Sequence, residues 1–150
     1  MPHVVRGRTA AMAAAVGLLA AGFVATRSSA APSAVGGALY NSSQASAGMK
    51  AYATNCSSCH GEKLEGGAGP ALTGPTLKTL SKNTKLSVGD AFTFLSQQMP
   101  LNAPASLSHD QYTSIMAYLL KFNGYRAGSK ALTYQAATGS KVEFTTQKGH

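Results

Sequence analysis

The chain has 150 residues and a formal net charge of +8, with 13 lysine and arginine residues against five aspartate and glutamate residues. Four histidines and five acids leave little material for acid–base catalysis. The lysines are scattered, with few aromatic residues between them, which argues against a nucleic-acid-binding protein.

Residues 1–30 have the layout of a secretory signal peptide. Basic residues precede an uncharged, alanine-rich stretch over 9–26, and the small residues Ser28 and Ala30 have the spacing of a cleavage site. The alternative is an uncleaved membrane anchor, because about 20 apolar residues can span a bilayer. Alanine is only weakly apolar, so the sequence favours cleavage and predicts an exported, periplasmic protein.

The remaining chain has the length of one domain. Its composition predicts a flexible lead-in over 31–42, a folded domain over 43–127 and a C-terminal extension over 128–150. Without the three arginines of the first 30 residues, ten basic residues face five acids. This modestly basic surface predicts protein partners with an acidic surface, and contact with a membrane only if the N-terminus is retained.

A first helix is expected over residues 43–54. Gly48, Tyr52 and Cys56 recur every four residues and therefore share one helical face. A glycine within a helix costs about 1 kcal/mol relative to alanine, so we expect another helix to approach closely there. Tyr52 either fills that crossing or is an ordinary core aromatic residue.

The run Cys56-Ser57-Ser58-Cys59-His60 predicts a covalent haem site. Two thiols one helical turn apart can add to the two vinyl groups of a haem, and the adjacent imidazole then becomes an axial iron ligand. A zinc site needs about four Cys or His ligands, and a thioredoxin-like pair needs a βαβ pattern; the sequence offers neither. We therefore expect one haem c, held by Cys56, Cys59 and His60.

The glycine-rich segment 61–74 predicts a loop that lies against the haem edge. An axial histidine usually donates its second ring N–H to a backbone carbonyl, and Pro70 is the expected acceptor. Leu72 is expected to pack on the haem. The alternative is a merely flexible loop.

A second helix is expected over 87–97, with a capping box formed by Ser87 and Asp90 and an end set by Pro100. Met99 then lies on a loop, where its thioether is a suitable sixth iron ligand. Met49 and Met116 lie in expected helices, where methionine usually fills a core. The remaining candidates are His109 and His150, which lie in polar surroundings.

The last helix begins at the box of Ser108 and Gln111 and ends at Asn123-Gly124. Its apolar residues recur at helical spacing and are expected to pack on the face of Gly48 and Tyr52. Beyond residue 127 the chain is either an extended strap over the domain or disordered.

These motifs together, over residues 45–125, resemble a class I cytochrome c. The resemblance implies an all-α fold of about three to four helices around one haem c. It also implies Cys56 and Cys59 as thioether attachment points, His60 and Met99 as axial ligands, and one-electron transfer in place of enzymatic catalysis.

Segments 99–108 and 122–128 are similar to cytochrome subunits that serve quinoprotein dehydrogenases. This implies a periplasmic dehydrogenase as electron donor and the respiratory chain, with a terminal oxidase, as acceptor. Lysines near the haem loops are expected to attract an acidic partner: Lys63, Lys78, Lys82 and Lys85.

Two other functions stay open at this point. One is a haem peroxidase or gas-binding cytochrome, which needs an open or displaceable sixth position and a polar residue such as His109 near the iron. The other is a membrane-tethered subunit of a larger oxidoreductase. The pair Met99-Pro100 favours the carrier over the first of these.

Overall fold

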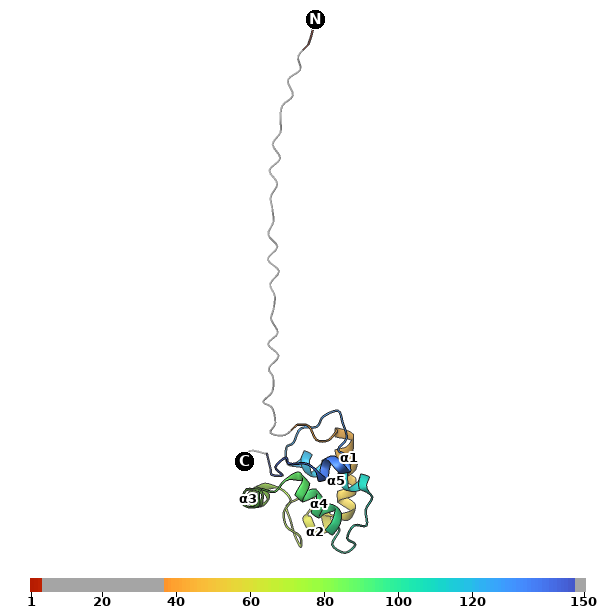
Figure 1. The fold of residues 1–150 in the computed structure, drawn as a ribbon, viewed down its shortest axis with the longest axis vertical. Helices are drawn as coiled ribbons and strands as arrows, with labels where there is room; N and C mark the ends of the chain where they lie inside the picture. Colours follow the sequence, from red (N-terminus) through yellow and green to blue (C-terminus); the bar gives the residue numbers. More distant parts are fainter. Residues whose placement is uncertain (4–36, 148–150) are drawn as a thin grey trace. The chain divides into compact units, whose positions relative to one another are not determined.

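The computed structural model describes residues 1–3 and 37–147, so nearly all of the predicted signal peptide and half of the lead-in lie outside the described residues. Within them the fold is all-α, as predicted (Figure 1). The helices are α1 (Ser42–Asn55), α2 (Ser57–His60), α3 (Gly74–Thr84), α4 (Val88–Gln98), α5 (His109–Phe122) and α6 (Tyr134–Thr138). In this part of the chain, no helix is both long and apolar enough to cross a bilayer.

The crossing of α1 and α5 is the centre of the fold. A Cβ atom on Gly48 would lie 1.7 Å from the carbonyl oxygen of Ser114, so only glycine lets the two helices approach this closely. One turn along, the rings of Tyr52 and Tyr118 pack with centroids 5.2 Å apart. The close approach predicted from the spacing of Gly48 and Tyr52 is confirmed.

Helices α4 and α5 begin at the predicted capping boxes. The Ser87 hydroxyl accepts from the backbone N–H of Asp90, whose carboxylate accepts from the N–H of Ser87. Hydrogen bonds from Ser87 hold the pKa of Asp90 below its usual value. Ser108 and Gln111 form the same reciprocal pair at the start of α5.

Helix α3 and the short helix α6 are elements that the sequence did not predict. Pro75 lies in the first turn of α3 and Lys85 ends this helix in the left-handed conformation, but only Leu77 and Ser81 are buried. Figure 1 shows α3 end-on and set apart from α1, α4 and α5. The large aliphatic residues of α3 are only Leu77 and Leu80, which are too few to identify a helix from the sequence.

Residues 128–147 form a strap over the domain, as the first of the two alternatives had it, but they include the short helix α6 and are not extended throughout. The carbonyl oxygens of Val142 and Ser140 accept from the backbone N–H groups of Val88 (2.7 Å) and Gly89 (3.0 Å). These are N–H groups of the first turn of α4, which have no partner within the helix. The side chain of Phe144, at 3% exposure, joins the core.

The described end of the lead-in also contacts the domain. Tyr40 is buried, and its hydroxyl donates to the carbonyl oxygen of Tyr125 at 2.6 Å. The Gln44 amide pairs with the backbone of Leu132 through two hydrogen bonds of 2.8 Å. Hydrogen bonds thus join the segment before α1 to the segment after α5, and α1 itself to the strap.

Candidate functional site

The thiols and the imidazole of the C-x-x-C-H run lie on a single helical turn. Cys56 precedes α2, and its carbonyl oxygen accepts from the backbone N–H groups of Cys59 (3.2 Å) and His60 (2.9 Å). Both cysteines are free thiols; Cys56 is half-buried and Cys59 is exposed. Burial, with a contribution from Cys59, raises the pKa of the Cys56 thiol to about 11, so this thiol is protonated at neutral pH.

The His60 ring is held by the contact predicted from the sequence. Its Nδ1 lies 2.8 Å from the carbonyl oxygen of Pro70. A carbonyl oxygen can only accept, so Nδ1 carries a hydrogen and donates the hydrogen bond, and in the neutral imidazole Nε2 keeps its lone pair. That is the tautomer with which a histidine binds a metal through Nε2.

The loop that follows α2 is fastened to it by its backbone. The N–H groups of Gly66 and Gly69 donate to the carbonyl oxygens of His60 and Cys59, each at 2.8 Å. Leu64, which is fully buried, accepts from the N–H of Leu72 at the same distance. The loop is thus a built part of the site, and Leu64 is an anchor that the sequence analysis missed.

Gly69 explains the glycine content of this loop. A Cβ atom there would lie 2.8 Å from Cε1 and 2.9 Å from Nδ1 of His60. The backbone therefore lies directly against the imidazole, at a distance that no side chain permits. Steric contact and the hydrogen bond from Nδ1 together restrict how the ring can turn.

Tyr52 and Leu72 connect this region with the core. The Tyr52 hydroxyl donates to the carbonyl oxygen of Gly61, the residue after His60, at 2.7 Å. Burial raises the pKa of Tyr52, which keeps the hydroxyl protonated as a donor. Tyr52 therefore does more than fill the helix crossing. Leu72 is half-buried and packs against the core.

Met99 lies at the C-cap of α4, on the loop where the sequence placed it, and its side chain is half-buried. Its N–H donates to the carbonyl oxygen of Leu95 at 3.2 Å. Its own carbonyl oxygen accepts from the hydroxyl of Tyr112 on α5 at 2.6 Å. Tyr112 also accepts from the N–H of Leu107, so a single phenol ties both ends of the loop 99–107.

The sequence did not predict the role of Tyr112, because this residue is part of the apolar pattern of α5 and no neighbouring residue marks it.

Other candidate iron ligands have different surroundings. Met116 is fully buried, Met49 is 51% exposed on α1, and the His109 ring stacks on Tyr134 with centroids 3.9 Å apart. His150 is outside the described residues. Among those described, no three His, Cys, Asp or Glu residues gather as a metal site.

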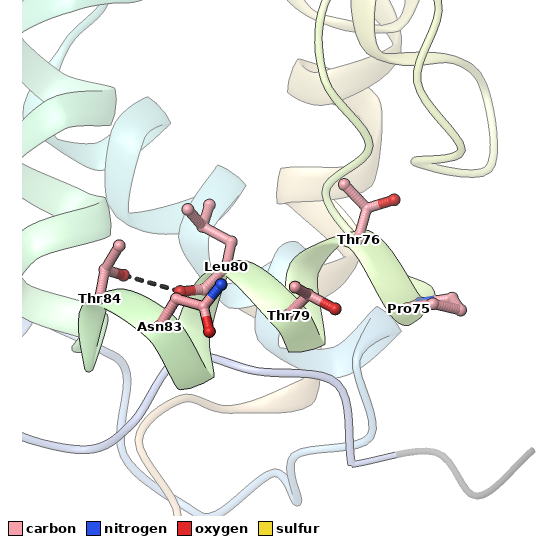
Figure 2. A pocket seen from close by; sticks show the side chains of 6 residues that line it. All are labelled: Pro75, Thr76, Thr79, Leu80, Asn83 and Thr84. Carbon is pink, nitrogen blue, oxygen red and sulfur yellow. Dashed lines mark hydrogen bonds between the residues drawn. The ribbon is translucent and has the colours of Figure 1, made fainter.

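One face of α3 lines an open groove of about 640 Å³ (Figure 2). Leu80, at 48% exposure, is its large apolar side chain, and the hydroxyl of Thr84 donates to the Leu80 carbonyl at 2.9 Å. None of the predicted haem residues lines this groove. Its lining residues are Pro75, Thr76, Thr79, Leu80, Asn83 and Thr84.

A second groove, of about 390 Å³, joins α3 to the strap and is basic. Lys82 and Lys85 come from the α3 end and Lys141 from the strap. The carboxylate of Glu143 lines the same groove and accepts from the Ser81 hydroxyl at 3.0 Å. Of the four lysines expected around the haem loops, the structure brings Lys82 and Lys85 into this groove.

Comparison with known proteins gives one family and one solved structure. The family described as cytochrome C oxidase, cbb3-type, subunit III matches residues 43–119. The crystal structure of the sulfane dehydrogenase SoxCD from Paracoccus pantotrophus is 27% identical, with a TM-score of 0.48 over 63% of this chain. The match covers 50% of the SoxCD chain, so this chain spans about half of it. No curated protein matches the sequence.

Proposed function

The chain belongs to the cytochrome c family described as subunit III of cbb3-type cytochrome c oxidase, and on this premise we propose that it is an exported one-electron carrier with a single, covalently bound haem c. Membership of the family implies haem c and electron transfer. The attachment points, the axial ligands and the partners are the finer parts of the proposal.

The donor set fits a haem c. Cys56 and Cys59 offer two thiols on one helical turn for thioether bonds, and His60 is held with Nε2 free to bind iron. Met99 offers a soft thioether as the sixth ligand. When bound, haem c supplies an Fe(II)/Fe(III) couple that accepts and releases one electron.

The protein's part in this reaction is to hold ligands and exclude water. The contact between His60 and Pro70 fixes the ring and increases its donor strength. With His60 and Met99 both bound, no substrate has access to the iron. A thioether ligand in this position favours the reduced state and so raises the reduction potential.

Exposed apolar side chains provide surface for a flat apolar ring. Leu80 on α3, Phe94 on α4 and Leu101 after Met99 have exposures of 48%, 58% and 78%. Phe94 lies five residues before Met99 and Leu101 two residues after it, and Leu80 comes from a separate helix. We expect the haem to cover part of this surface.

The observation that carries the proposal is the 2.8 Å contact between His60 Nδ1 and the Pro70 carbonyl. The test is an optical spectrum of protein matured in a periplasm that attaches haem c. We expect haem that resists acid-acetone extraction, a weak red-region band of ferric His/Met ligation, and a ferrous form that does not bind carbon monoxide. Rapid carbon monoxide binding would instead favour the gas-binding or peroxidase function.

Export and the electron-transfer partners complete the proposal. The composition of residues 1–30 supports a periplasmic location, where a dehydrogenase of the quinoprotein type would donate electrons to be passed to the respiratory chain. Sequencing the N-terminus of the mature protein distinguishes a cleaved carrier, which begins near residue 31, from a tethered subunit that retains the apolar segment.

We further propose that an acidic partner docks at the basic groove, where three ammonium groups outnumber the one carboxylate of Glu143. The variant Lys82→Glu/Lys85→Glu should lower the second-order rate of electron transfer to an acidic partner about tenfold at low ionic strength. The loss should shrink as salt is added. The control Lys50→Glu/Lys130→Glu makes the same charge change at two exposed lysines that do not line the groove. Equal losses in both variants would show that net charge, and not this groove, guides the partner.

A further inference from the structure

Asn123, at the end of α5, is a fully buried polar residue that the proposed function has not used. Its Nδ2 donates to the carbonyl oxygens of Leu72 (2.9 Å) and Leu119 (3.0 Å). Its Oδ1 accepts from the hydroxyl of Thr73 at 2.8 Å. The amide therefore joins α5 to a segment 50 residues earlier in the chain, with its donors and its acceptor all engaged.

The Thr73 hydroxyl makes this long-range contact and no local capping bond. Thr73 occupies the N-cap of α3, where a threonine hydroxyl ordinarily accepts from the backbone of the first turn. No such cap forms here, and the hydroxyl donates to Asn123 instead.

The segment held by Asn123 directly follows the partner of His60. Pro70 supplies the carbonyl that orients the imidazole, and Leu72 and Thr73 are the second and third residues after it. The carbonyl oxygen of Asn123 also accepts from the N–H of Gln147 in the strap at 2.8 Å. Asn123 is thus the point at which α5, the strap and the loop that orients His60 are joined.

We propose that Asn123 is a positioning residue for the axial histidine. Its amide fixes the exit of the loop, so that the Pro70 carbonyl stays within hydrogen-bonding distance of Nδ1 of His60. A hydrogen bond from Nδ1 strengthens the imidazole as a ligand, which favours ferric iron. Loosening the loop should therefore weaken this bond and raise the reduction potential. The inference rests on the proposed function, in which His60 binds the iron.

The test compares Asn123→Ala with Gln44→Ala in the haem-loaded protein. Gln44 is a matched control, because its amide also makes two hydrogen bonds to a distant backbone, that of Leu132, away from the His60 loop. Both variants should lower the melting temperature. Only Asn123→Ala should raise the reduction potential and make exchange of the His60 Nδ1 proton about fivefold faster in NMR spectra of the ferrous protein, the effect of losing the one hydrogen bond from Nδ1 to Pro70.

Thr73→Val is a milder variant that removes only the hydroxyl donated to Asn123 and keeps the shape of the side chain. It should raise the reduction potential and speed the exchange of the His60 Nδ1 proton, as Asn123→Ala does, but by a smaller amount. It provides the test if Asn123→Ala does not fold. Unchanged values in Thr73→Val, or equal shifts in Asn123→Ala and Gln44→Ala, would overturn the inference. Failure of the proposed function is distinct, because the wild-type protein itself would then lack covalent haem or His/Met ligation.

Discussion

The two segments that carry the proposed iron ligands are built in different ways. The His60 segment, residues 56–72, is fastened by backbone hydrogen bonds to its own helical turn, by the Tyr52 hydroxyl and by the buried Leu64. The Met99 segment has six successive exposed residues, 101–106, and the phenol of Tyr112 ties its two ends. The His60 side of the site is thus held by many contacts, and the Met99 side depends on few.

Because the two segments are held so differently, we expect different behaviour from the His60 side and the Met99 side. In the proposed function, the steric contact with Gly69 and the hydrogen bond to Pro70 would hold the His60 ligand in one orientation in both oxidation states of the iron. A loop with few buried contacts opens more readily than the core. We therefore expect ligand exchange to begin on the methionine side.

The largest effect is expected from removing the covalent attachment. Cys56→Ser and Cys59→Ser should each abolish one thioether bond, because a hydroxyl does not replace the thiol in the addition to a vinyl group. Mass spectrometry and acid-acetone extraction report the bonds that remain. Haem that stays attached through two bonds in both variants would contradict the assignment.

On the methionine side, Met99→Ala should lower the reduction potential and open the iron to carbon monoxide. Axial ligands move haem potentials over a range of about 0.8 V, so the change should be large. Met49→Ala is the control, because this methionine is half-exposed on α1. An unaltered potential in Met99→Ala would place the sixth ligand elsewhere.

The features that the sequence predicted are those with short or fixed spacing. The capping boxes at Ser87 and Ser108 need residues three apart, and the contact between His60 and Pro70 follows from a short loop after α2. Gly48 was informative because a glycine in the middle of a helix requires a cause. Each of these signals reflects a physical requirement that few residue types can meet.

The features that it did not predict depend on contacts between distant residues. Tyr112 lies 13 positions from Met99, and Asn123 lies 50 positions from Thr73. In the sequence, Tyr112 looks like an ordinary core residue of a helix and Asn123 like an ordinary helix end. The strap caps α4 through backbone carbonyls, which any residue supplies. Helix α3 is polar on most of its surface, so its position depends on the tertiary fold.

A smaller effect should follow on the histidine side from Gly69→Ala. The new methyl group would overlap the His60 ring, and overpacking of this kind costs about 1–3 kcal/mol. We expect a lower melting temperature together with a shifted reduction potential. Gly139→Ala is the control, because its Cβ would lie 3.3 Å from the nearest atom and far from the ring in sequence. Equal reduction potentials in the two variants would show that a displacement of the His60 ring does not affect the potential.

The smallest effect is expected from Tyr112→Phe, which keeps the buried ring and removes only the hydroxyl that donates to the Met99 carbonyl. The variant also loses the longer bond that the hydroxyl accepts from the N–H of Leu107 at 3.3 Å. Loss of the shorter bond to Met99 alone costs about 1 kcal/mol, which should increase the rate of cyanide binding to the ferric protein about fivefold by releasing the methionine more often. Tyr134→Phe is the matched control, because its hydroxyl bonds to Ser96 and not to the loop. If both variants bind cyanide at the wild-type rate, the Met99 loop is held by the iron and not by Tyr112. The two sides of the site would then differ in the strength of their iron ligands and not in the contacts that hold each segment.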